Sequence, residues 1–258
     1  MPAPVNPFKA ALAEGRQQIG LWIALTSPDA TELCAGAGFD WLVIDGEHAA
    51  WDVPSILAQL RAAAAHPAHP IVRLPVAETW MVKQVLDIGV QTVLVPMVES
   101  AATARDMVRA MRYPPEGVRG VGATLARASG YGATPDYVVT ANAETCLVVQ
   151  VESRAGVAAL DDILAVEGVD AVFIGPADLA ADMGYPGQYG VPEVQAVIDD
   201  CHARIAAAGK GAGVLTFDPA QGRRYLEAGV AFVGVGADAQ LLARAARTLA
   251  TEMRRVEP

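Results

Sequence analysis

The chain contains 258 residues, of which 53% are hydrophobic and 19% are charged, a composition that excludes a disordered or fibrous protein. Its 19 Lys and Arg residues against 29 Asp and Glu residues give a net charge of −10 at pH 7. Because the sequence has no basic run that could neutralise a phosphate backbone, we expect no nucleic-acid partner. The length fits either two small domains or one α/β barrel of roughly 250 residues.

The sequence also argues against secretion and membrane insertion. Residues 1–9 are rich in proline and have too little apolar length for a signal peptide, and no later segment approaches about 18 unbroken apolar residues. We therefore expect a cytoplasmic protein with no membrane contact. The three cysteines, Cys34, Cys146 and Cys201, lack the paired spacing of a metal site, and we interpret them as small core residues.

Short apolar runs alternate with alanine-rich segments of helical length along the whole chain. The eight predicted strands fall, in order, within residues 19–25, 38–45, 70–74, 89–96, 146–151, 168–175, 211–215 and 229–236. The clearest helical segments between and after them are 53–65, 101–111, 191–208, 219–228 and 239–254. The apolar runs are continuous, as expected of parallel strands that are covered on both faces.

Four of these runs follow a glycine, at positions 38, 89, 168 and 229, which suits the positive φ found just past the end of a helix. Eight alternating β and α units predict a single (β/α)₈ TIM barrel over residues 1–258. The alternative is an open doubly wound sheet, which would carry Gly-x-Gly-x-x-Gly after its first strand, and no such motif follows Leu25. The Pro/Gly-rich stretch 113–135 is expected to be a long loop after the fourth strand, followed by a short helix.

Reactive groups in such a barrel follow the C-terminal ends of the strands. Those positions hold Asp45-Gly46-Glu47-His48 after the second strand, Arg73 at the end of the third, Gln150 and Glu152 at the fifth, and Gly175-Pro176-Ala177-Asp178 after the sixth. One histidine, one arginine, one glutamine and several carboxylates are therefore expected to converge on one rim.

Glu152 and Asp178 come from neighbouring predicted strands, with no cysteine or second histidine beside them. A cation held there would have hard oxygen ligands, which favours Mg²⁺ or Mn²⁺ over structural zinc, with Co²⁺ also open. Two protein ligands would leave room for a chelating 2-oxo acid at a Lewis-acid site. The alternative is that both carboxylates are ordinary rim residues paired with Arg154 or Arg73.

Arg73 offers a fixed fork of donors for a carboxylate or an enolate oxygen, although a structural salt bridge is the alternative. His48 lies three residues after Asp45, close enough for that carboxylate to orient the ring of a general base. The other histidines precede the third strand (His66 and His69) or fall within a helix (His202), so we expect structural or solvated roles for them. No lysine stands at a strand's C-terminal end, which argues against Schiff-base chemistry.

Six motifs together resemble one family. They are Trp41-Leu42-Val43-Ile44-Asp45-Gly46-Glu47-His48, Ile71-Val72-Arg73-Leu74-Pro75, Leu94-Val95-Pro96-Met97-Val98, Tyr113-Pro114-Pro115-Glu116-Gly117-Val118-Arg119-Gly120, Gln150-Val151-Glu152-Ser153 and Gly175-Pro176-Ala177-Asp178-Leu179. From about Gly20 to Leu242 the chain is similar to the metal-dependent class II pyruvate aldolases, typified by 4-hydroxy-2-oxoheptanedioate and 2-dehydro-3-deoxyglucarate aldolases. The resemblance implies a TIM barrel of the phosphoenolpyruvate/pyruvate superfamily and a homo-oligomer, commonly a hexamer that exchanges the last helix.

The resemblance also implies a reaction and roles for residues. The reaction is reversible aldol cleavage between pyruvate, or a 2-oxo acid such as hydroxypyruvate, and an aldehyde. Glu152 and Asp178 would hold Mg²⁺ or Mn²⁺, Arg73 would stabilise the enolate, and His48 would move the proton of the 4-hydroxyl. The substrate would also touch Gln150 and the backbone of Gly175, Pro176, Ala177 and Asp178.

Further positions are assigned by the resemblance to the surroundings of this site. Asp45 is the expected partner of His48, and Asp87 matches a position that raises the basicity of that histidine. Trp22, Val121 and Leu215 match the aldehyde end of the pocket, although barrel-mouth packing explains them equally well. Apart from the resemblance, Arg119 and Arg127 in the long loop could bind an acidic aldehyde tail, although loop arginines are usually solvated.

Three other functions stay open at this point. An acyl-CoA lyase of the same superfamily shares the two-carboxylate metal site, but it would want a basic patch for the CoA phosphates. A non-catalytic binding barrel would not need His48, Arg73, Glu152 and Asp178 together. A phosphate-binding isomerase is suggested by Gly234-Val235-Gly236 after the last strand, yet it gives no reason for the two carboxylates.

Overall fold

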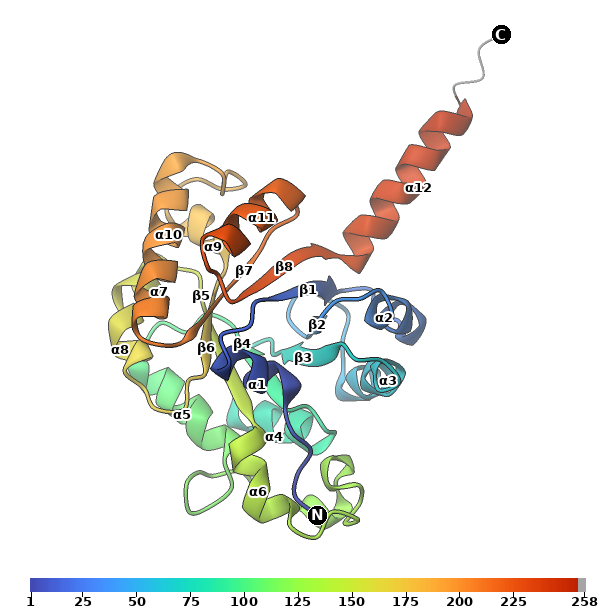
Figure 1. Ribbon diagram of the computed structural model, residues 1–258, viewed down its shortest axis with the longest axis vertical. Helices are drawn as coiled ribbons and strands as arrows, with labels where there is room; N and C mark the ends of the chain where they lie inside the picture. Colours follow the sequence, from blue (N-terminus) through green and yellow to red (C-terminus); the bar gives the residue numbers. More distant parts are fainter. Residues whose placement is uncertain (255–258) are drawn as a thin grey trace.

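The computed structural model describes residues 1–254, and its centre is a closed barrel of parallel strands in which each strand pairs with the next and β8 closes on β1 (Figure 1). The strands are β1 (Gln18–Ile23), β2 (Trp41–Asp45), β3 (His69–Arg73), β4 (Thr92–Val95), β5 (Cys146–Val151), β6 (Ala171–Ile174), β7 (Gly211–Leu215) and β8 (Phe232–Ala237). The order β1 to β8 around the barrel confirms the predicted TIM barrel.

Helices follow the strands and cover the outside of the barrel, except that the first helix precedes β1 and the last extends away from the barrel (Figure 1). They are α1 (Pro7–Ala13), α2 (Pro28–Ala35), α3 (Val53–Ala63), α4 (Thr79–Asp87), α5 (Ala101–Met111), α6 (Tyr137–Glu144), α7 (Arg154–Ala158), α8 (Leu160–Leu164), α9 (Pro176–Asp182), α10 (Pro192–Ala207), α11 (Pro219–Glu227) and α12 (Asp238–Arg254), with 3₁₀ turns η1 (Ala123–Leu125) and η2 (Arg127–Ser129). Several of these helices begin with a side chain that caps the first turn. The side chains of Ser27, Asp52 and Ser100 accept backbone N–H bonds in the first turns of α2, α3 and α5.

The N-terminal end of the barrel is closed by α1, and aromatic rings fill the interior above it. Phe8 is fully buried, stacks on His69 with ring centroids 6.1 Å apart, and meets Trp41 and Phe232 edge-on. Glycines make room for these rings, because a Cβ at Gly20 would overlap the indole of Trp41. This end of the barrel is therefore a packed core.

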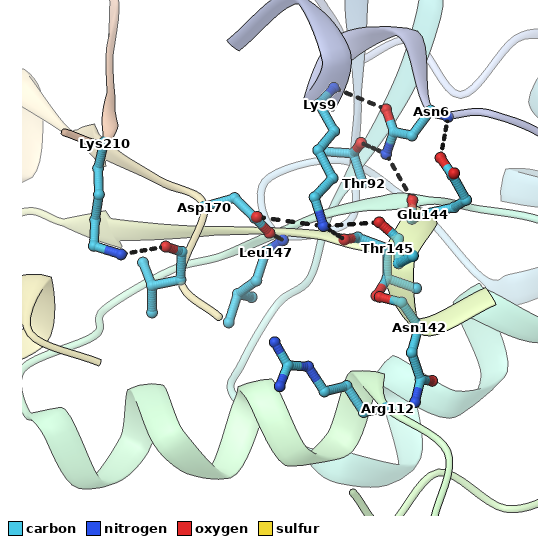
Figure 2. Close-up of polar contacts among 12 residues, drawn as sticks. Asn6, Lys9, Thr92, Arg112, Asn142, Glu144, Thr145, Leu147, Asp170 and Lys210 are labelled. Carbon is cyan, nitrogen blue, oxygen red and sulfur yellow. Dashed lines mark hydrogen bonds and ion pairs between the residues drawn. The ribbon is translucent and has the colours of Figure 1, made fainter. Parts of the chain in front are cut away.

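Polar contacts hold α1 in place beneath the barrel (Figure 2). Lys9 Nζ donates to the carbonyl of Thr145 at 2.7 Å and lies 3.4 Å from Asp170 Oδ1. Asn6 Nδ2 donates to Thr92 Oγ1 at 3.0 Å. These bonds reach the starting ends of β4, β5 and β6, so the opposite end of the barrel is the end left open for a ligand.

The last helix departs from the pattern of the others. In Figure 1, α12 extends away from the barrel, and Asp238 is its one buried residue among those described. Leu242, Leu249 and Met253 are 61%, 60% and 68% exposed. Within residues 1–254 no helix is both long enough and apolar enough to cross a membrane.

Candidate active site

The C-terminal ends of the strands surround a cavity of about 270 Å³. Its lining consists of Trp22, Ala24, Asp45, His48, Arg73, Gln150, Phe173, Gly175, Pro176, Ala177, Asp178, Leu215, Phe217 and Ala237. Most of the residues that the sequence singled out therefore converge, although they come from β1, β2, β3, β5, β7 and the segments after β2 and β6. Phe173, Phe217, Ala24 and Ala237 were not foreseen. The position of Phe217, two residues beyond Leu215, is the signal that could have indicated it.

Glu152 directly follows β5 and is 3% exposed. It does not line the cavity itself, but it contacts Gln150, which does. Its Oε1 accepts the backbone N–H of Met97 at 2.9 Å, and its Oε2 accepts a bond from Gln150 Nε2. Met97 presents its N–H from a left-handed backbone with φ of 52°, a conformation that costs energy for a non-glycine residue and tends to occur at functional sites. Met97 was not predicted, because a backbone donor leaves no signal in residue type.

Burial raises the pKa of Glu152 to about 7, and the negative charges of Asp178 and Glu47 act in the same direction, while its two hydrogen bonds act against it. Among the described residues, no ion pair neutralises Glu152 or Asp178, because Arg73 pairs with Asp45 and Glu47, and Arg154 pairs with Asp182. The alternative in which Arg154 or Arg73 pairs with these two carboxylates is therefore not what the structure shows.

The arrangement around Glu152 fits a divalent cation. A Cβ on Gly175 would lie 2.5 Å from Glu152 Oε2, so a glycine is required for that carboxylate and the start of α9 to approach each other. Asp178 follows in the first turn of α9. Residues 1–254 contain no cluster of three or more His, Cys, Asp and Glu side chains with metal-binding geometry. A cation here would take two protein carboxylates and complete its shell with substrate or water, as Mg²⁺ and Mn²⁺ do.

Arg73 is held rigidly by two carboxylates. Its Nε and Nη2 donate to the two oxygens of Asp45 at 2.9 and 2.6 Å, and its Nη1 lies 2.8 Å from Glu47 Oε2. The guanidinium also lies 5.5 Å from the centre of the Trp22 ring. The arginine is thus fixed at the cavity wall, and its remaining N–H groups are available to a ligand.

Contrary to the expectation from the sequence, Asp45 does not hydrogen-bond to the His48 ring. Both of its oxygens accept bonds from Arg73, and Oδ1 also accepts the backbone N–H groups of Glu47 at 2.9 Å and His48 at 3.3 Å. The carboxylate beside the His48 ring is Glu47, whose Oε2 lies 3.9 Å from Nε2. The ring itself is 67% exposed. Sequence reasoning gave Glu47 no role, although it stands between two residues that it did select.

Asp87 and Val121 do not reach this cavity within one protomer. Asp87 ends α4, accepts Arg119 Nη2 at 2.9 Å, and lines a separate hollow together with Gly122 and Leu125. Val121 is 65% exposed. Arg119 is fully buried, 4.3 Å from the ring centre of Tyr113. This arginine anchors the long loop to α4, so it binds its own chain in the described protomer.

Comparison with known proteins identifies the family of this chain. The model of the HpcH/HpaI aldolase/citrate lyase family matches residues 18–245. The chain belongs to this family. It is 58% identical to the hydroxypyruvate/pyruvate aldolase of Roseovarius nubinhibens over 247 residues, which covers 96% of each protein. It is also 55% identical to the 4-hydroxy-2-oxo-heptane-1,7-dioate aldolase of Escherichia coli over 245 residues, 95% of this chain and 94% of that one.

The fold of the family is shared as closely as the sequence. A crystal structure of an HpcH/HpaI aldolase/citrate lyase family protein from Burkholderia cenocepacia superposes with a TM-score of 0.93 at 42% identity, covering 97% of this chain and all of that one. Membership of the HpcH/HpaI family confirms the resemblance inferred from the six motifs.

Proposed function

We propose that this protein is a divalent-metal-dependent aldolase that reversibly joins pyruvate, or hydroxypyruvate, to an aldehyde. The observation that supports this most strongly is a cavity lined by Asp178, a rigid arginine and an exposed imidazole, with Glu152 beside it against Gln150 and Gly175; neither Glu152 nor Asp178 has a cationic partner among the described residues. Relatives at 55–58% identity are a hydroxypyruvate/pyruvate aldolase and a 4-hydroxy-2-oxo-heptane-1,7-dioate aldolase. We therefore do not favour the acyl-CoA lyase, binding-module and isomerase alternatives.

Glu152 and Asp178 are the residues that would hold Mg²⁺ or Mn²⁺ in a single aldolase domain spanning residues 1–258. When bound, the cation supplies Lewis-acid stabilisation of negative charge on the 2-oxo acid. Gln150, Gly175, Pro176 and Ala177 line the cavity, and we propose that Gln150 and the backbone of the other three bind the keto acid.

The chain's own groups account for the movement of charge and protons. In cleavage, His48 takes the proton from the C4 hydroxyl, the bond between C3 and C4 breaks, and the electron pair collects as an enolate. Arg73 donates N–H bonds to the enolate oxygen, and its fixed position means that little reorganisation is needed as charge develops. In aldol addition the same groups act in reverse order.

The aldehyde end of the cavity is apolar. Trp22 and Leu215 face it, and Phe217 lies beside them. Their surfaces contribute binding and selectivity toward the aldehyde rather than charge stabilisation. The role of Asp87 in raising the basicity of His48, and that of Val121 at the aldehyde end, stay predictions from the family resemblance.

The decisive experiment is solvent deuterium exchange at the pyruvate methyl group, followed by NMR with enzyme and Mn²⁺ and then with excess EDTA. It requires no knowledge of the natural aldehyde. Exchange that depends on the metal supports enolate formation at this site. Absence of exchange for both pyruvate and hydroxypyruvate, with metal present, would contradict the proposal.

We also propose that the protein forms a homo-oligomer, a hexamer by resemblance, in which α12 packs on a neighbouring copy. The apolar side chains of α12 are exposed in the single protomer, and the helix extends away from its own barrel (Figure 1). An exposed apolar stripe of this kind is typical of a protein–protein interface.

A further inference from the structure

One carboxylate near the site has no part in the roles described so far. Glu47 lies in the turn after β2, and its side chain is 16% exposed. Its Oε2 stands 2.8 Å from Arg73 Nη1 and 3.9 Å from His48 Nε2. Glu47 does not line the cavity itself, so it touches the two reactive groups and not the space that a substrate would fill.

The turn is built so that Glu47 has little freedom. The Gly46 N–H donates to the Arg73 carbonyl at 2.8 Å, and a Cβ on Gly46 would collide with that same oxygen. The Glu47 N–H is held by Asp45 Oδ1 at 2.9 Å. The backbone on both sides of Glu47 is therefore fixed against the end of β3, which places its carboxylate at the side of Arg73.

Asp45 cannot substitute for Glu47. Both oxygens of Asp45 are engaged by Arg73 Nε and Nη2, which leaves Nη1 to Glu47 alone among the described carboxylates. The charged groups around Glu47 are Arg73 from β3, His48 from its own turn, Asp45 from β2 and Asp178 from α9. Of these, Arg73 and His48 are the two groups that attract it.

We propose that Glu47 is a positioning residue that links Arg73 to His48, so that the enolate-stabilising group and the base keep one fixed relation. This inference rests on the proposed function. Without Glu47, Arg73 Nη1 loses its carboxylate partner, and the exposed His48 ring loses the one anionic side chain that lies beside it among the described residues. Removing the Glu47 carboxylate therefore lowers kcat and leaves KM for the substrate nearly unchanged, because Glu47 does not touch the substrate.

The test uses E47Q, which keeps the shape of the side chain and removes its charge, and E47A, which removes the carboxylate and leaves a space. The matched control is E14Q, because Glu14 also pairs with an arginine, Arg16, but on the exposed surface near the other end of the barrel. Each variant is assayed with Mn²⁺ for pyruvate methyl exchange and for aldol cleavage, and its thermal unfolding is recorded to establish that it folds.

We expect E47Q to lower kcat for cleavage by about tenfold, as for other residues that orient reactive groups, while KM for the 2-oxo acid stays within about twofold. Sodium formate should restore part of the activity of E47A but not of H48A, because a small carboxylate can occupy the vacated space. A merely structural salt bridge would lower the unfolding temperature without rescue by formate.

The outcomes separate the two proposals. If wild type and E14Q show metal-dependent exchange and E47Q matches them in kcat, the inference about Glu47 is overturned and the aldolase function stands. A folded E47A that formate does not restore also overturns it. If the wild type itself shows no metal-dependent exchange, the proposed function fails, whatever Glu47 does.

Discussion

Charge around the cavity is distributed unequally between two pairs of carboxylates. Asp45 and Glu47 share the guanidinium of Arg73, whereas Glu152 and Asp178 have no such partner among the described residues. Burial of an unpaired carboxylate is costly, which is why the pKa of Glu152 is raised to about 7. A buried, unpaired Glu152 does not stabilise the fold. Its position is better explained by the cation that we propose binds there.

The carboxylate pair can be tested by neutral variants of the same shape. E152Q and D178N should each lose metal-dependent pyruvate exchange by at least about a hundredfold, because either change removes an anionic oxygen ligand. D182N is the control, since Asp182 is an exposed acid on the same helix, paired with Arg154. Circular dichroism should show an intact fold in all three. Retained exchange in both E152Q and D178N would remove them from the cation site.

Arg73 and His48 should fail in different ways. R73A is expected to lose both methyl exchange and aldol cleavage, because both pass through an enolate that the guanidinium stabilises. H48A should lose cleavage by about a hundredfold or more, as expected for a general base, and keep more of the exchange. The measurement compares the two rates for each variant by NMR. If H48A lost methyl exchange and aldol cleavage to the same extent, this would contradict the assignment of His48 as the base for the C4 hydroxyl proton.

Among the elements, α1 contributes a buried aromatic side chain, Phe8, to the core at the closed end of the barrel. F8A should lower the free energy of unfolding by about 3–5 kcal/mol, as for other buried aromatic residues, because Phe8 is fully buried against His69, Trp41 and Phe232. Urea unfolding measures the change. V139A, on the exposed face of α6, is the control and should differ from wild type by less than about 0.5 kcal/mol.

The strands were predictable because the signals for them are local. The runs that follow Gly38, Gly89, Gly168 and Gly229 became β2, β4, β6 and β8, and each glycine has a positive φ, between 86° and 103°. The long loop was predicted as a loop, but its anchor, the buried Arg119 stacked on Tyr113, was not. An arginine that stacks inside a loop resembles a solvated one in sequence, because only tertiary packing distinguishes them.

The sequence predicts which residues form the site better than it predicts which of them contact one another. Barrel topology alone brings His48, Arg73, Gln150 and Asp178 to one rim, so their convergence follows from the order of the strands. Which carboxylate faces the His48 ring does not follow, because Asp45 and Glu47 both lie within three residues of it in sequence. The bidentate geometry of Arg73 decides that question, and it belongs to the folded state.

For the molecule as a whole, two buried histidines make stability depend on pH. Burial lowers the pKa of His69 and of His202 to about 4, below the usual 6.5. The unfolded chain takes up these protons near pH 6.5 and the folded chain only near pH 4. The stabilisation is therefore present above pH 6.5 and is lost as the pH falls toward 4, by about 2 kcal/mol per histidine between pH 7.5 and pH 5.

Urea unfolding at those two pH values, in EDTA, checks this dependence. H202L should reduce the loss of stability on acidification, while H66Q, a change at a partly exposed position, should not. The comparison between variants is needed because Glu152, with its raised pKa, contributes in the opposite direction as the pH falls. An acid-induced loss that is the same in wild type and H202L would show that His202 is not buried in its neutral form.

Assembly is the remaining property of the whole molecule. The 17 residues of α12 make a helix about 25 Å long, on which Leu242, Leu249 and Met253 recur at helical spacing and are exposed. We expect light scattering after size exclusion to give the wild type a mass several times that of one chain. The double variant L242E/L249E should shift toward the monomer, since burying two carboxylates would oppose packing on a neighbour.

Loss of assembly should also reach the active site, because the two are joined at the base of α12. Asp238, the first residue of that helix, accepts the backbone N–H groups of Ala24 at 2.8 Å and Leu25 at 3.2 Å, and Ala24 and Ala237 line the cavity. Because α12 is proposed to pack on a neighbouring copy, we expect its release to disturb this part of the cavity. We therefore expect L242E/L249E to raise KM for the aldehyde more than KM for the 2-oxo acid, since the keto acid is proposed to bind beside Gln150 and Gly175 instead. An oligomeric wild type whose dissociated variant keeps both KM values would show that the site is independent of assembly.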